Sequence, residues 1–186
     1  MILPSRLAFA IGILATLSLA VVVHILVVLT IPQNVSHSAY SDIAAFGEDR
    51  AFNLLPDVLP DAEPLPALDP AMKHAACRFS LKNGPVLFTA SIPVSFWSIG
   101  LFNEAGEAVY SLNNRTAGSD ILSLLLLTPE QLSILRENPP PDLEDLIVIE
   151  IPEANGFALL RAFAPSQWQS LEVQTALKSA YCGSLG

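Results

Sequence analysis

A long stretch without charge is the first unusual feature of this 186-residue sequence. No Asp, Glu, Lys or Arg occurs between Leu7 and Ile31, a run of 25 residues. As a helix this run would be about 37 Å long, enough to cross a hydrocarbon core of about 30 Å with some tilt. A cleaved secretory signal has an apolar region of only about 7–15 residues, so the length favours an uncleaved signal anchor. A cleaved signal peptide stays open as the alternative.

The apolar run divides the sequence into four expected parts. Residues 1–6 would form a cytoplasmic tail, 7–31 a transmembrane helix, 32–70 a stalk with a Pro-rich strap, and 71–186 an exported domain. Arg6 precedes the run, whereas three acidic residues precede the first arginine beyond it. Because positive residues tend to stay on the cytoplasmic side, we expect a single-pass protein with its N-terminus inside and the remainder outside.

Basic residues are scarce, and their scarcity restricts the partners of the exported part. All 18 acidic residues but only eight of the nine basic residues follow the apolar run, which leaves this part with a net charge of −10. Such a charge argues against nucleic acid and against anionic lipid headgroups as partners. The bilayer itself, contacted through the apolar helix, is the first expected partner.

Cysteine and histidine are too few for the common metal and catalytic motifs. The sequence has two cysteines and three histidines, without a CxxC or a Cys/His cluster, so we expect no metal site and no cofactor. In an oxidising compartment Cys77 and Cys182 are expected to form a disulfide, the alternative being two buried free thiols. GxSxG, HExxH and phosphate-binding glycine loops do not occur. A hydrolase-type triad using His74 stays open, but the sequence favours a protein without catalysis.

Small and polar residues recur every four positions within the apolar run. They form a ridge that consists of Ala8, Gly12, Thr16, Ala20 and His24. Small residues at this spacing let two helix backbones approach closely, so the ridge predicts packing against a partner helix, from a second copy or from another subunit. Alternatively, these residues reflect the ordinary composition of membrane helices, and His24 is neutral and tolerated by lipid.

The residue pattern of the exported part predicts a structure that consists mainly of β-strands. Apolar residues alternate from Cys77 onward, and Asn83-Gly84, 103–106 and Asn155-Gly156 are expected hairpin turns. Two helices are predicted to begin at Thr128-Pro129 and Pro165-Ser166. The second is expected to pack on the sheet through Trp168, Leu171, Ala176 and Leu177. The predicted fold is therefore an antiparallel β-sandwich or curled sheet with two flanking helices, plus the N-terminal transmembrane helix.

Four polar residues in the exported part are candidates for a ligand pocket. Asn113, Asn114 and Arg115 follow a predicted strand and would either cap this corner of the fold or form the polar rim of a pocket for a small anionic or hydroxylated ligand. Arg161 shares strand parity with apolar residues, so we expect it to be partly buried and paired with Glu150 on a neighbouring strand. A substrate clamp is the alternative for Arg161.

Four short motifs follow one another in the exported part. A strand ending in Gly-Pro-Val spans 80–86, an aromatic strand includes 96–98, an Arg-Thr-x-Gly element spans 115–118, and a later strand over 157–161 ends in arginine. This ordered set resembles the bacterial family called domain of unknown function 1254, between Asp69 and Cys182. The sequence departs from that family upstream of the first strand, where "LDPAMKHAACRF" replaces an N-x-D-T-x-Y segment.

The resemblance implies a cellular setting and a partner. It places the protein in a bacterial inner membrane with its C-terminal domain in the periplasm. Larger relatives carry a companion domain, of unknown function 1214, that this sequence lacks, which implies a second membrane-anchored subunit. We therefore expect a binding or scaffolding subunit, with a periplasmic ligand-binding or sensory domain, or a hydrolase-type enzyme, as alternatives. The resemblance names no activity and no catalytic residue.

Overall fold

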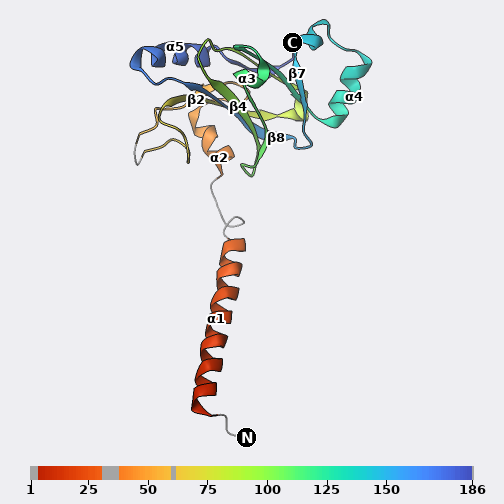
Figure 1. The fold of residues 1–186 in the computed structure, drawn as a ribbon. Coiled ribbons are helices and arrows are strands. Elements are labelled where there is room, and N and C mark those ends of the chain that lie inside the picture. The colour runs from red at the N-terminus through yellow and green to blue at the C-terminus, as the bar shows by residue number, and fades with distance from the viewer. Residues whose placement is uncertain (1–3, 31–37, 60–61, 186) are drawn as a thin grey trace. The chain divides into compact units, whose positions relative to one another are not determined.

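The computed structural model describes residues 4–30, 38–59 and 62–185, and Figure 1 shows their fold. The chain divides into two compact units, Met1–His37 and Ser38–Gly186. The predicted stalk begins within residues 31–37, which lie outside the described part of the chain.

Helix α1, Ser5–Thr30, makes up the described part of the first unit. It has 26 residues and a mean hydropathy of 2.7, and it is the one helix among the described residues that is long and apolar enough to cross a membrane. None of its residues is buried. Its apolar side chains are therefore available to a lipid or protein environment.

Two β-sheets form the second unit. The first sheet is antiparallel and has the order β1 (Asn53–Leu54), β2 (Met72–Ser80), β8 (Asn155–Phe163), β4 (Trp97–Asn103) and β5 (Ala108–Asn113). The second sheet has the order β7 (Ile147–Glu150), β6 (Ile121–Leu127), β3 (Val86–Ser91) and β9 (Tyr181–Ser184). Within it only β6 and β7 pair in parallel.

The main core lies between the two sheets. Strand side chains alternate between two faces, so every second residue of β2 and β4 points inward, including Phe79 and Trp97, which are buried. Phe88 and Leu124 bury the facing side of the second sheet. This two-sheet arrangement, with its helices and the apolar helix α1, confirms the predicted fold class.

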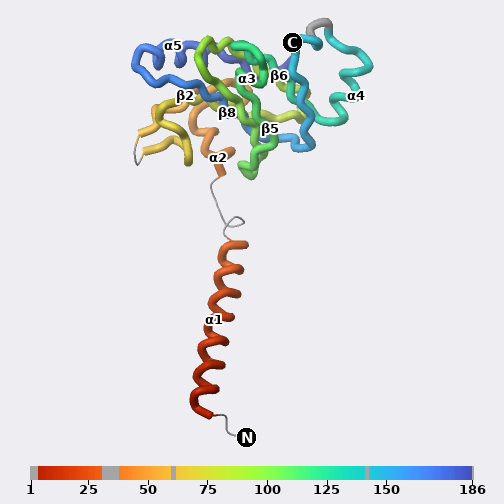
Figure 2. The backbone as a smooth tube through the Cα atoms, in the orientation of Figure 1, coloured from red at the N-terminus to blue at the C-terminus, as the bar shows by residue number. Residues whose placement is uncertain are grey.

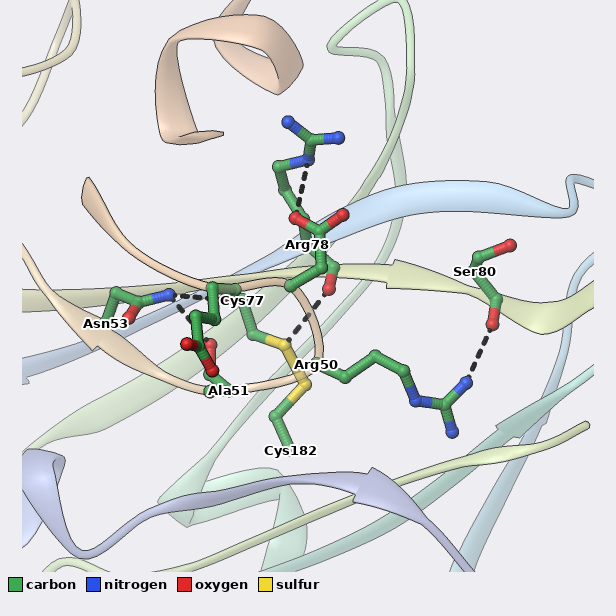
Figure 3. Close-up of a disulfide and its surroundings, with 9 residues drawn as sticks. Arg50, Ala51, Asn53, Cys77, Arg78, Ser80 and Cys182 are labelled. Atoms are coloured by element: carbon green, nitrogen blue, oxygen red, sulfur yellow. Dashed lines mark hydrogen bonds and ion pairs between the residues drawn. A yellow bond between two sulfur atoms is a disulfide. The ribbon is translucent and has the colours of Figure 1, made fainter. Parts of the chain in front are cut away.

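A disulfide between Cys77 and Cys182 connects the two sheets. Cys77 lies on β2 of the first sheet and Cys182 on β9 of the second, and Figure 3 shows the bond between them. The pairing predicted from the sequence is confirmed. Because 105 positions separate the two cysteines, the bond removes much conformational freedom from the unfolded chain and stabilises the fold by up to about 4–5 kcal/mol in the chain-entropy model.

A second apolar layer covers the other face of the five-stranded sheet. Helix α2, Ala39–Ile43, is followed by the 3-10 turn Ala44–Phe46. Ile43 packs together with Leu55 and Leu65 of the Pro-rich segment against Ala76 and Phe157 of the sheet. Leu55 and Leu65 are thus buried on the sheet and hold the Pro-rich segment against it, whereas Leu59 is exposed.

Arginine side chains attach the segment after α2 to strand β2. Nε of Arg78 lies 3.1 Å from Oδ1 of Asp49, and its guanidinium carbon lies 4.4 Å from the centroid of the Tyr40 ring. Arg50 donates from Nη1 to the carbonyl oxygen of Ser80 at 3.1 Å. Figure 3 shows both arginines near the disulfide of Cys77 and Cys182. Arg78 therefore sits between an aromatic ring and a carboxylate.

The expected hairpin at Asn83-Gly84 is wrong. The 3-10 turn Leu81–Asn83 leads from β2 into β3, which belongs to the other sheet. Leu81 is buried and its backbone N–H donates to the carbonyl oxygen of Ala154, which draws the chain between the sheets. Asn-Gly therefore marks a change of direction here, but the following strand pairs with β6 and β9 and not with β2.

The expected hairpin around Asn155-Gly156 is also wrong. Strand β7 pairs with β6, whereas β8 lies between β2 and β4. A Cβ atom on Gly156 would lie 2.2 Å from the carbonyl oxygen of Phe102. Gly156 is therefore required by the close approach of β8 to β4, and not by a turn.

The two predicted helices form, and the second packs through Leu177 as expected but not through Trp168 and Leu171. Helix α4, Pro129–Glu137, has the expected capping box of Thr128 and Gln131, and the 3-10 turn Pro141–Asp145 follows it. Helix α5, Gln167–Lys178, begins after the N-cap Ser166. Val173 and Leu177, four residues apart, form its buried stripe, whereas Trp168 and Leu171 are exposed. The expected packing of Trp168 and Leu171 on the sheet is therefore wrong.

Two leucines on α5 give a direct test of this orientation. We expect Leu177→Ala to lower the free energy of unfolding by about 2–5 kcal/mol, because it leaves a cavity in the core. Leu171→Ala, on the exposed face, should change it by less than about 0.5 kcal/mol. Urea unfolding of the full chain in detergent, followed by tryptophan fluorescence, measures both. Equal losses for the two variants would contradict the orientation of α5.

Candidate functional site

A row of polar residues crosses four adjacent strands of the five-stranded sheet. His74 on β2 lies opposite Arg161 on β8, Arg161 lies opposite Ser98 on β4, and Ser98 lies opposite Asn113 on β5. All four alternate with residues that face the core, so they lie on the outer face of this sheet. The sheet order, which brings β8 between β2 and β4, creates this row.

Arg161 is held by a serine. Its Nε donates to Oγ of Ser98 at 2.6 Å, and Ser98 is buried while Arg161 is exposed. The expected ion pair with Glu150 is wrong, because β7 belongs to the other sheet and is not a neighbour of β8. The serine hydroxyl orients the guanidinium group, whose outer N–H groups are available to an anion or to a hydroxyl group.

His74 is buried and lies next to this guanidinium group. Burial, together with the positive charge of Arg161, lowers the pKa of His74 from 6.5 to about 4, although Asp69 opposes the shift. The imidazole is therefore neutral near pH 7. Neighbouring strands are about 4.8 Å apart, so His74 and Ser98, two strands apart, are separated by roughly 10 Å with Arg161 between them. This arrangement does not form the serine–histidine contact of a hydrolase.

Asn113 and Asn114 fix the corner after β5. The short helix α3, Asn114–Ala117, is capped by Asn113, whose Oδ1 accepts from the N–H groups of Arg115 and Thr116 at 3.0 Å each. Nδ2 of Asn114 donates to the carbonyl oxygen of Ser95 at 3.2 Å. Both asparagines thus brace the backbone, which is the structural alternative left open by the sequence.

The structure brings only some of the candidate pocket residues together. Arg161 and Asn113 lie in the polar row, whereas Arg115 is exposed on α3. His74 and Ser98 belong to the row but were not expected there, and only their shared register with Arg161 could have revealed them. Among the described residues, no three His, Cys, Asp or Glu side chains are grouped as metal ligands.

The ridge residues of α1 divide into two groups. Ala8, Gly12 and Thr16 line a shallow hollow on the helix, flanked by larger apolar side chains. A Cβ atom on Gly12 would meet nothing within 4 Å. In a helix of 3.6 residues per turn each step of four residues rotates by about 40°, so Ala20 and His24 lie progressively further round the helix. The hollow that these residues line lies in the N-terminal half of α1.

Comparison with known proteins gives a likeness of fold. No family model matches the chain, and no curated protein matches it. The VPA0106 protein from Vibrio parahaemolyticus has a similar structure, with a TM-score of 0.57 and 11% sequence identity over 78% of this chain and 35% of that chain. A putative uncharacterized protein from Burkholderia cenocepacia has a TM-score of 0.49 and 13% identity, over 69% of this chain and 35% of its own. This chain therefore spans about a third of the length of these proteins.

The buried histidine predicts a pH dependence of stability. In the unfolded chain His74 binds a proton near pH 6.5, but in the folded domain only near pH 4. Between these values the unfolded state binds more protons, so stability should fall as the pH is lowered, by up to about 3 kcal/mol. We expect His74→Gln to remove this part of the slope, as measured by urea unfolding between pH 4 and pH 7. An unchanged slope would show that His74 does not contribute.

Proposed function

We propose that this chain is a single-pass protein of a bacterial inner membrane whose β-rich domain lies in the periplasm and serves as a binding or scaffolding subunit. The observation that carries the proposal is the combination of α1 with the disulfide. Helix α1 is long, uncharged over most of its length and without buried residues. The Cys77–Cys182 bond belongs to an oxidising compartment.

Thiol labelling tests the proposed topology. The native cysteines are both in the disulfide, so single cysteines can be introduced as reporters. We expect Ser133→Cys, on the exposed side of α4, to react with a membrane-impermeant maleimide in intact spheroplasts, and Ser5→Cys to react only after lysis. The reverse pattern would invert the topology, and a mature chain without α1 would replace the anchor by a cleaved signal.

The proposed partner is a second membrane-anchored subunit. The hollow at Ala8, Gly12 and Thr16 supports it, because small residues allow a second helix to approach the backbone of α1. The similar fold in VPA0106 occurs within a chain of which this one covers 35%. The resemblance to the domain of unknown function 1254 family supports a companion subunit in the same way.

The mass of the complex in mild detergent tests the partner. We expect the full chain, isolated from its own membranes, to be found in an assembly with a second polypeptide. Gly12→Ile, which fills the hollow with a branched side chain, should reduce the assembled fraction, whereas Leu14→Ile on the same helix should leave it unchanged. Native mass spectrometry measures both. A monodisperse monomer for the wild-type chain would contradict the scaffolding function.

Binding of a small anion is a second candidate function. It rests on the exposed side chain of Arg161, which Ser98 orients through a hydrogen bond. The residue paired with Arg161 on β2 is the neutral His74, and not a carboxylate. The guanidinium N–H groups are available to a ligand, because no residue of the polar row carries a negative charge that would compete for them. It supports recognition of a carboxylate or phosphate group more readily than a reaction, because Ser98 is already bonded to the guanidinium group.

A further inference from the structure

The outward face of α5 carries the most exposed large apolar side chain of the β-rich domain among the described residues. Trp168 is 90% exposed and Leu171 is 71% exposed. The other tryptophan, Trp97, is completely buried. Single exposed apolar residues are ordinary, but a tryptophan beside a leucine at the edge of a hollow is typical of an interaction site.

A groove runs along this face. Its volume is about 460 Å³, and its walls are formed by α5 and by the end of β3 with the residues just after it. The lining residues include Trp168, Leu171, Glu172, Thr175, Ser91 and Pro93. The four helix residues are spaced i, i+3, i+4 and i+7, which places them on one face. A second hollow borders Gln167, Trp168 and Leu171. Trp168 therefore stands as a ridge between two depressions.

An aromatic ring and a carboxylate are side by side in this groove. Trp168 and Glu172 are one helical turn apart, so their side chains are neighbours. Within the part of the chain that the structure describes, Glu172 has no ion pair or hydrogen bond, and no cation lies over Trp168. The groove thus offers a π-face and a negative charge with apolar surface beside them.

The same pair of groups holds an arginine elsewhere in this protein. Arg78 lies over the Tyr40 ring at 4.4 Å and has the Asp49 carboxylate 3.1 Å from its Nε. A cation gains from both contacts, since the ring quadrupole and the carboxylate attract the same charge. At Trp168 and Glu172 the matching cation has to come from another molecule.

We propose that the groove of α5 is the docking site for a protein segment that inserts an arginine or lysine between Trp168 and Glu172 and lays apolar residues on Leu171 and Pro93. The proposal rests on the proposed function, because the segment would belong to the companion subunit. Charge favours such a partner: the chain beyond α1 has a net charge of −10, which attracts a basic segment and speeds its association.

Two other occupants fit the groove less well. In a dimer of this chain through α5, each copy would bring the net charge of −10 of the part beyond α1, and like charges oppose such an interface. A bilayer with anionic headgroups would be repelled by the same net charge of −10. Figure 2 shows α5 on a different side of the second unit from α2.

Photo-cross-linking tests the docking site in the full chain within its own membranes. p-Benzoylphenylalanine replaces Thr175, an exposed residue that lines the groove and is not one of the proposed contact residues, and the cross-linked peptides are sequenced by mass spectrometry. We expect an adduct to a second polypeptide, at a segment in which arginine or lysine is flanked by apolar residues. Adding Glu172→Gln should lower the yield about fivefold or more, the effect of losing one charge-assisted contact. The same probe at Ser133, on exposed α4, is the matched control and should not give this adduct.

Several results would overturn the docking site. They are adducts to lipid, adducts to a second copy of this chain, no adduct at all, or a yield that Glu172→Gln leaves unchanged. Glu172 is exposed, so an unchanged urea midpoint for Glu172→Gln shows that a lower yield does not come from unfolding. If the complex persists in detergent while the cross-link fails, only this surface is wrong. If the wild-type chain is a monomer, the companion subunit itself is wrong.

Discussion

Strand β2 joins the layers of the domain because its side chains alternate between two faces. Cys77 points inward and is bonded to β9 of the facing sheet. Arg78, the next residue, points outward and contacts Tyr40 of α2 and Asp49 of the segment that follows α2. One strand thus fixes the distance between the sheets and also the position of the outer layer. The polar row on that outer face begins on the same strand, at His74.

Local signals in the sequence were sufficient for several elements. The hairpin of β4 and β5, the apolar strand β6 and the capping box of α4 all depend on residues within about 15 positions of one another. Two cysteines in a chain with an apolar N-terminal helix were also enough to predict their pairing. The first three elements have short-range causes. For the disulfide, each cysteine has a single possible partner in the chain.

The errors arose where distant segments decide the structure. Asn83-Gly84 and Asn155-Gly156 have the composition of hairpin turns, yet one precedes a crossing between sheets and the other begins a central strand. A turn motif specifies that the chain changes direction, whereas the strand it then joins depends on apolar residues far away. The partner of Arg161 was missed for the same reason, since Ser98 is 63 positions away. The elements that pack against α5 also decide which of its faces is buried, because apolar residues lie on both sides of this helix.

The attachment of the segment after α2 has a mechanical consequence. This segment is joined to β2 by the pairing of β1 and by Arg50 and Arg78, and β2 is itself linked covalently to β9 near the end of the chain. A pull on Ser38 would therefore reach β2 through these contacts, and β2 is paired with β8 over its whole length. The C-terminal strand cannot separate from β2 under this load while the disulfide is intact. The disulfide therefore keeps the C-terminal strand attached to the strand that receives the load.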